Sequence, residues 1–224
     1  MSVPVITIDG PSGSGKGTIA RLLSDELGWH LLDSGALYRV LAYAAEQAGI
    51  GQDAVSDELI ELARNLPIRF ESVDGVTHAM LSGKDVERHI RSETAGNAAS
   101  KVAAMPEVRA ALLGRQRDFA RQPGLVADGR DMGATVFPQA DAKIFLTASV
   151  EDRARRRYKQ LKEKGIGAKF AALSREIRER DERDMNRVAS PTRPAAGALL
   201  LDSSGLAIEQ VLDRVREFLR EKGL

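Results

Sequence analysis

The 224 residues of the chain include 33 Lys and Arg, 32 Asp and Glu, and 43% hydrophobic residues, for a formal net charge of +1. This balance is typical of a globular protein and argues against a disordered chain. The absence of cysteine excludes disulfides, thiolate metal sites and thiol nucleophiles, and no apolar run predicts a signal peptide or a membrane span. We therefore expect one compact cytoplasmic domain with appendages.

A strand, a glycine-rich loop and a helix open the chain. The run Val3 to Ile8 is β-branched and continuous, which predicts a buried parallel strand that tolerates Pro4 at its start. Apolar residues recur at helical spacing from Thr18 to Leu27. Beyond this helix we expect a short strand at residues 29–32 and an alanine- and leucine-rich helix at residues 34–48.

Residues 57–100 differ from their surroundings and predict an insert. A short helix is expected at residues 58–65, followed by strands at residues 68–72 and 76–81. The dipeptide Asp74-Gly75 between these strands is typical of a tight hairpin turn.

The second half of the chain alternates helices and strands. Helical patterns run from residue 93 to residue 120, and a helix with one apolar face follows residue 208. Apolar strands are expected at residues 125–127, 143–146 and 198–201. This alternation predicts an α/β fold, a parallel sheet flanked by helices and joined by right-handed crossovers.

The sequence GPSGSGKGT matches the phosphate loop of proteins that bind nucleoside triphosphates, and it lies between a strand and a helix as that motif requires. Backbone amides and the helix N-terminus would surround the polyphosphate of ATP, and Lys16 would bind its β- and γ-phosphates. The alternatives are an ordinary turn and a dinucleotide-binding loop, whose third glycine would fall on Thr18. The expected ATP-binding residues are Gly10, Pro11, Ser12, Gly13, Ser14, Gly15, Lys16, Gly17 and Thr18.

The residue after Lys16 is Gly17, where the general motif has the Ser or Thr that ligates Mg²⁺. We therefore expect carboxylates at strand ends to hold Mg²⁺ through water, because this ion releases its waters reluctantly. Asp9, Asp33 and Asp128 each follow an apolar run, and we assign the metal to Asp33 and Asp128. The alternative for each aspartate is a helix or turn cap.

Other motifs separate the classes of protein that carry a phosphate loop. The chain has no Asn-Lys-x-Asp motif, which a GTP switch needs to read guanine, and no apolar strand ending in Asp-Glu, which a motor-like ATPase would carry. What remains is a kinase for a small anionic or polar acceptor. A regulatory module that binds ATP without an acceptor is the alternative from another class.

Four segments, GPSGSGKGT, LLDSGALYR, ADGRDMG and ERDERDMNR, together resemble the bacterial cytidylate kinases, and the likeness extends from Val5 to about Val211. The resemblance implies a P-loop nucleoside monophosphate kinase fold with a monophosphate-binding insert at about residues 57–100 and a mobile lid at about residues 150–168. It also implies that ATP, with Mg²⁺ as cofactor, phosphorylates CMP and dCMP. A kinase for another monophosphate, such as UMP or AMP, is the alternative.

The resemblance further implies an acceptor site that reads cytosine. Cytosine presents an amino donor beside ring acceptors, so a carboxylate and a guanidinium would complement it, whereas uracil would leave the carboxylate facing a carbonyl. Preference over UMP would be incomplete, because an unpaired buried polar group costs about 1 to 3 kcal/mol. The expected residues are, for the phosphate and entrance, Ser34, Tyr38, Arg39 and Arg130; for the base, Ser100, Arg109 and Asp131; and for the sugar and closure, Arg180, Asp184 and Arg187.

Residues 151–187 hold thirteen Lys and Arg against eight Asp and Glu, so we expect an anion to bind there, although the interspersed acids argue against nucleic acid. Arg153 and Arg157 lie one helical turn apart and are the expected lid arginines, acting in catalysis with Lys16 and Arg130. A plain basic face and a solvated helix with ion pairs are the alternatives for this segment. We expect a monomer without a membrane partner.

Overall fold

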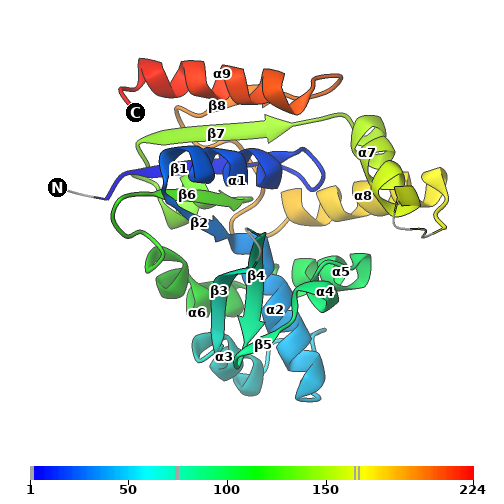
Figure 1. The fold of residues 1–224 in the computed structure, drawn as a ribbon. Coiled ribbons are helices and arrows are strands. Elements are labelled where there is room, and N and C mark those ends of the chain that lie inside the picture. Colours follow the sequence, from blue (N-terminus) through cyan, green and yellow to red (C-terminus); the bar gives the residue numbers. More distant parts are fainter. Residues whose placement is uncertain (1–2, 74–75, 164, 166) are drawn as a thin grey trace. The chain divides into compact units, whose positions relative to one another are not determined.

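The computed structural model describes residues 3–73, 76–163, 165 and 167–224. The chain divides into two compact units: the segment up to Leu32 together with Arg117–Leu224, and Asp33–Gln116. Each unit contains a sheet of its own, as Figure 1 shows. The first unit is therefore built from both ends of the chain, and the second from one continuous segment.

Strands and helices alternate through the first unit. Its elements are β1 (Val5–Asp9), α1 (Lys16–Leu27), β2 (His30–Asp33), β6 (Leu125–Gly129), the π-helix η1 (Met132–Val136), β7 (Ala142–Thr147), α7 (Val150–Glu163), α8 (Phe170–Met185), β8 (Leu199–Asp202) and α9 (Ile208–Glu221). The five strands expected from the apolar runs are all present, with ends within two residues of the expected ones.

The sheet of the first unit has the strand order β2-β6-β1-β7-β8. At its centre, β1 pairs in parallel with both β6 and β7, so that Ile8 lies opposite Asp128 on one side and Ile144 on the other. β7 pairs in parallel with β8. The expected α/β fold with a parallel sheet is confirmed. The central strand ends at the glycine-rich loop, and parallel sheets bind their ligands at the carboxyl ends of such strands.

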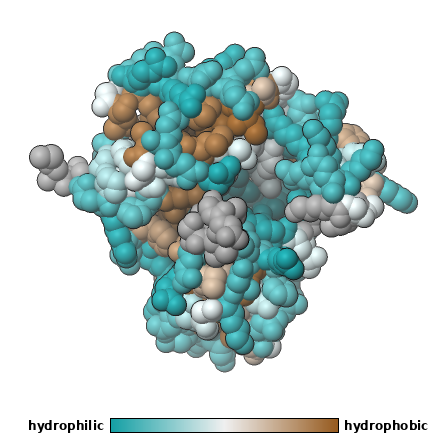
Figure 2. Space-filling view, viewed as in Figure 1, coloured by the Kyte–Doolittle hydropathy of each residue, from teal (hydrophilic) through white to brown (hydrophobic). Residues whose placement is uncertain are grey.

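Helices α1 and α9 cover one face of this sheet. Ile19 and Leu23 of α1 pack with Val211 and Val215 of α9 and with Ile8 of β1 in one buried cluster. Figure 2 shows apolar atoms gathered where these two helices meet. Because a buried side chain of this size contributes roughly 1.5–3 kcal/mol, the cluster anchors the strand that carries the glycine-rich loop.

The second unit combines a small antiparallel sheet with helices. Its elements are α2 (Ser34–Gln47), α3 (Asp57–Arg64), β3 (Ile68–Val73), β4 (Val76–Leu81), β5 (Lys84–Asp85), α4 (Glu87–Ile90), α5 (Glu93–Val102) and α6 (Pro106–Arg117). The expected pair of strands is confirmed, with Ile68 opposite Leu81. The turn predicted at Asp74-Gly75 lies outside the described residues. The expected insert at residues 57–100 falls within this unit.

Some elements differ from the expected ones. β5 and α4 have two and four residues, too few to produce a periodic pattern. The helix expected at residues 93–120 divides into α5 and α6, and Pro106 opens the second helix because its fixed φ and missing N–H suit a first turn. Over the described part of the chain, no helix has the length and apolarity needed to cross a membrane.

Candidate functional site

The backbone of the loop after β1 passes close to the backbone of β7. Gly10 has a φ of 146°, and a Cβ atom there would overlap the carbonyl oxygen of Leu146 in β7. Gly15 precedes α1 in a left-handed conformation with a φ of 96°. Its carbonyl accepts hydrogen bonds from the amides of Thr18 and Ile19, so the loop continues directly into the helix. The amides of this first turn carry the positive end of the helix dipole, which suits an anion.

Lys16 is the first residue of α1 and is only 9% exposed. Its Nζ donates to the carbonyl of Pro11 at 3.4 Å and lies 3.8 Å from Oδ1 of Asp128, near the end of β6. Because water reaches neither group freely, their opposite charges attract more strongly than they would on the surface. The predicted phosphate-binding cation is therefore held between the loop and a carboxylate.

Gly17 occupies a position that a larger residue would disturb. A Cβ atom at Gly17 would lie 3.1 Å from Oδ2 of Asp128. A serine or threonine would therefore press against the carboxylate. No group of three His, Cys, Asp or Glu side chains among the described residues could hold a metal ion. One carboxylate beside a phosphate loop nevertheless fits Mg²⁺, which is commonly bound through one or two carboxylates, substrate phosphates and its own waters.

Asp33 has other partners in the second unit. Its Oδ1 accepts from the amide of Ala36 at 2.9 Å and caps α2, and its Oδ2 accepts from Nη1 of Arg91 at 2.9 Å. Burial alone would raise the pKa of Asp33, but the charges of Arg91 and Arg39 outweigh it and lower the pKa below the ordinary value. Arg39 itself donates to the carbonyl of Ile90 at 3.1 Å. The helix cap is thus present, while a metal role for Asp33 stays a prediction.

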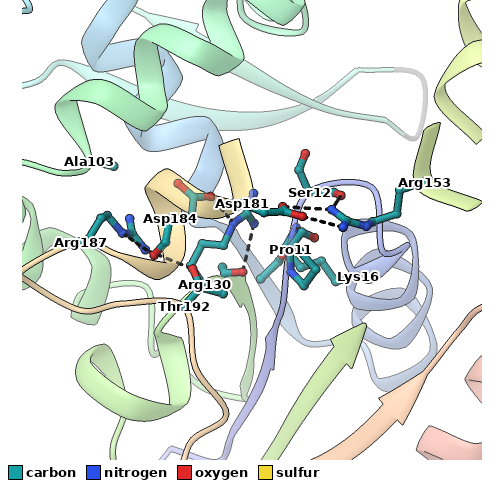
Figure 3. A network of polar contacts seen from close by, with 12 residues as sticks. Pro11, Ser12, Lys16, Ala103, Arg130, Arg153, Asp181, Asp184, Arg187 and Thr192 are labelled. Atoms are coloured by element: carbon teal, nitrogen blue, oxygen red, sulfur yellow. Dashed lines mark hydrogen bonds and ion pairs between the residues drawn. The ribbon is translucent and has the colours of Figure 1, made fainter. Parts of the chain in front are cut away.

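Arg153 lies on α7 and is 3% exposed. It donates to the carbonyl of Ser12 at 3.1 Å and to both carboxylate oxygens of Asp181 on α8, at 3.0 and 2.6 Å. Figure 3 shows its guanidinium between Ser12 and Asp181. Bidentate pairs of this kind are strong and directional. Arg153 therefore joins the phosphate loop to α7 and α8, and its expected contact with a triphosphate stays a prediction.

Arg156 is a residue of the site that sequence reasoning missed. Its Nη1 donates to the carbonyl of Ser14 at 3.1 Å, and its Nη2 donates to the carbonyl of Ser203 at 2.6 Å. The hydroxyl of Ser203 also donates to the carbonyl of Ser14 at 2.9 Å. Arg157 instead donates to Oε1 of Gln160 at 3.4 Å. Helical spacing could not separate these neighbouring arginines, because only tertiary packing decides which of them reaches the loop.

Three of the expected acceptor residues meet in the first unit. Nε of Arg130 donates to Oδ2 of Asp184 at 3.0 Å, and Nε of Arg187 donates to the carbonyl of Asp184 at 3.2 Å, an arrangement visible in Figure 3. Asp131 precedes η1 and is 3% exposed. Arg180 lies one turn before Asp184 on α8. The structure thus brings the segment after β6 to the end of α8.

The remaining acceptor candidates lie in the second unit. Ser34 donates its hydroxyl to Oε1 of Gln116 at 2.8 Å, and both side chains are buried. The guanidinium of Arg109 lies 5.7 Å from the centroid of the Tyr38 ring, a cation–π contact. Ser100 is buried on α5. Gln116 carries no sequence signal that could have identified it as a partner of Ser34.

Asp9 ends β1 and is 2% exposed. Its Oδ1 accepts from the amide of Met132 and its Oδ2 from the amide of Gly133, each at 2.8 Å. Burial raises the pKa of Asp9 to about 7 and outweighs the two amide bonds, which lower it, while the charges of Asp131 and Asp128 raise it further. A buried carboxylate with such a shift is characteristic of functional regions.

The raised pKa makes stability depend on pH in a defined direction. Folded Asp9 keeps its proton up to about pH 7, whereas the unfolded group releases it near pH 3.8. The free energy of unfolding should therefore fall as the pH rises from 3.8 to about 7. The contribution of this group is about 4 kcal/mol, at roughly 1.4 kcal/mol per pKa unit. Asp9→Asn should flatten this slope. Urea unfolding of both proteins from pH 4 to pH 8 measures it, and parallel curves would contradict the assignment.

A parallel sheet with a phosphate loop after its central strand, and with a nearly buried lysine in the first turn of α1, defines a P-loop nucleotide-binding protein. The family model described as cytidylate kinase matches residues 6–221. The chain therefore belongs to the cytidylate kinase family and is a nucleoside monophosphate kinase, a phosphotransferase.

Relatives extend this likeness over the whole chain. A cytidylate kinase of Klebsiella pneumoniae is 55% identical over 99% of this chain and 97% of its own. One from Nitrosococcus oceani is 57% identical over 98% of this chain and 97% of its own. A crystal structure of an uncharacterized protein from Eubacterium ventriosum has a TM-score of 0.52 and 9% identity, covering 97% of this chain and 98% of that chain. This last likeness shows the fold alone.

Proposed function

We propose that this kinase transfers the γ-phosphoryl group of ATP to the phosphate of CMP and of dCMP. One bond forms between an oxygen of the acceptor phosphate and the γ-phosphorus, the bond from that phosphorus to the β-phosphate oxygen breaks, and ADP leaves with the electron pair. The observation that carries the proposal is the phosphate loop with Lys16 beside Asp128, in a chain of the cytidylate kinase family. No covalent intermediate on the protein is needed.

The donor half of the proposal rests on the loop after β1. Its amides and Lys16 bind the phosphates of ATP, and Lys16 balances the charge that spreads over the moving group. Asp128 would hold Mg²⁺ through water, and Mg²⁺ would neutralise charge on the β- and γ-phosphates. Asp33 is kept as the second candidate. Arg153 and Arg157 are proposed as lid arginines, and the anchorage of Arg153 to Ser12 supports a place for it beside the loop.

The acceptor half follows the residues that the resemblance implies. Arg39 and Arg130 are proposed to bind the phosphate of CMP, and Asp131 to accept from the cytosine amino group. The pairing of Arg130 with Asp184 supports these roles, because it holds the guanidinium in one orientation. The remaining proposed contacts are, for the entrance, Ser34 and Tyr38; for the base, Ser100 and Arg109; and for the sugar and closure, Arg180, Asp184 and Arg187.

Positioning and charge neutralisation account for the reaction without a general base. The acceptor oxygen belongs to an ionised phosphate, so no proton has to be removed before attack. Insert and lid are proposed to close over the substrates and exclude the water that would otherwise accept the phosphoryl group. A monomeric cytoplasmic enzyme is the form that we propose, and sedimentation and cell fractionation test it.

A panel of acceptors tests the proposed function. A coupled assay with ATP and CMP, dCMP, UMP or AMP should give the highest kcat/KM for CMP and dCMP, with UMP lower by about one or two decades. Faster turnover of UMP or AMP would overturn the assignment of the base. ATP hydrolysis that no monophosphate accelerates would instead indicate a regulatory module.

A further inference from the structure

The end of β1 and the segment after β6 are joined by one carboxylate. We propose that Asp9 is a positioning residue for the acceptor, which fixes the segment carrying Arg130 and Asp131 to the strand that carries the phosphate loop. This inference rests on the proposed function, because that function assigns the acceptor to Arg130 and Asp131. Asp9 itself is not proposed to touch either substrate.

The geometry of this connection is specific. Each carboxylate oxygen of Asp9 accepts one backbone amide, from Met132 and Gly133, at 2.8 Å. These amides follow Asp131 directly and belong to the first turn of η1. At the other end, Asp9 immediately precedes Gly10 of the phosphate loop. The single short side chain of Asp9 thus links the donor loop to the proposed acceptor segment.

Two glycines allow the segment to lie close enough for this contact. A Cβ atom at Gly133 would come within 2.7 Å of Oγ1 of Thr7 in β1. A Cβ atom at Gly129 would come within 2.7 Å of Cγ of Met132, which folds back over it. Both distances are below normal contact, so a larger residue at Gly133 would push against β1, and one at Gly129 would displace the side chain of Met132. The motif DGRDMG is therefore shaped to bring two amides to Asp9.

Loss of the carboxylate should disturb the acceptor segment more than the phosphate loop. The loop has further supports, since Arg153 binds the carbonyl of Ser12, and Arg156 and Ser203 bind that of Ser14. Without Asp9, the amides at the start of η1 would be buried without an acceptor, a cost of about 1 to 3 kcal/mol that movement of this segment relieves.

Kinetics of Asp9→Asn test the proposal. The amide oxygen can replace only one of the two acceptors, so the KM for CMP should rise by about tenfold or more, while the KM for ATP changes by less than about threefold. Asp141→Asn is the matched control, because the carboxylate of Asp141 also accepts a backbone amide, that of Val5 at 2.8 Å, at the other end of β1. This control should keep both KM values. An equal rise in both, or no rise for CMP, would overturn the proposal.

Amide hydrogen exchange provides a readout independent of turnover. Exchange at Met132 and Gly133 should be slow in the wild-type protein and at least about tenfold faster in Asp9→Asn, with residues 10–18 unchanged. Equal exchange in the two proteins would overturn the proposal even if the variant were less active. If Asp9→Asn does not fold, hydrogen exchange of the wild-type protein still tests the contact. Rapid exchange at the amides of Met132 and Gly133 would show that Asp9 does not bind them. Failure of the wild type to use CMP would refute the proposed function and leave this measurement valid.

Discussion

Replacement of Lys16 by alanine is expected to lower kcat with CMP and ATP by about 10²- to 10³-fold, the effect of removing one preorganised charge from a phosphoryl-transfer site. Lys16 is nearly buried and lies 3.8 Å from Asp128, and an alanine there carries no charge that could balance the phosphates. The variant should fail with every acceptor, because the defect lies in the donor half. Steady-state kinetics with CMP, dCMP and UMP measure this.

Lys222→Ala is the matched control for this experiment. Lys222 is exposed at the end of α9, with its Nζ 5.5 Å from the centroid of the Phe218 ring. Removal of this surface charge should leave kcat within about twofold of the wild-type value. A Lys16→Ala enzyme with wild-type kcat would refute the role of Lys16.

Replacement of Asp131 by alanine is expected to lower kcat/KM for CMP by about one to two decades, while the KM for ATP stays within about threefold. The cytosine amino group would lose its acceptor in a place that is 3% exposed, where water cannot easily replace it. Asp131→Asn should lower kcat/KM less for UMP than for CMP, since the asparagine amide can donate a hydrogen bond to the uracil carbonyl. Steady-state kinetics with CMP and UMP measure the ratio of the two kcat/KM values.

The control for this second substitution is Asp213→Ala on α9. Asp213 is exposed and pairs with Arg216 three residues later, a surface ion pair of small energy. Its removal should not change the preference between CMP and UMP. If Asp131→Ala left that preference at the wild-type ratio, Asp131 would not be the residue that reads the base.

The donor loop could be predicted because its signal is local. Glycines and a lysine at fixed spacing between a strand and a helix specify a backbone shape that few other sequences adopt. The residues that hold this loop could not be predicted in the same way. Arg156 and Asp181 are charged residues on helices rich in charge, and only the folded chain shows that one reaches Ser14 and the other Arg153.

The fold, too, could be predicted from the sequence only in part. Apolar runs predicted all five strands of the parallel sheet, and the signal is strongest for β1 and β6, which are buried along their whole length. The strand order could not be predicted, since it depends on contacts between residues as distant as Ile8 and Asp128. η1 was missed because its five residues are too few for a periodic pattern, and its first amides are held by the carboxylate of Asp9.

The approach of Gly17 to the carboxylate of Asp128 ties the space at one position to the side chain at the other. A side chain at position 17 would require the tip of Asp128 to yield slightly, because a Cβ atom there would lie 3.1 Å from Oδ2. The glycine that departs from the common motif thus leaves room for this acid beside the first turn of α1.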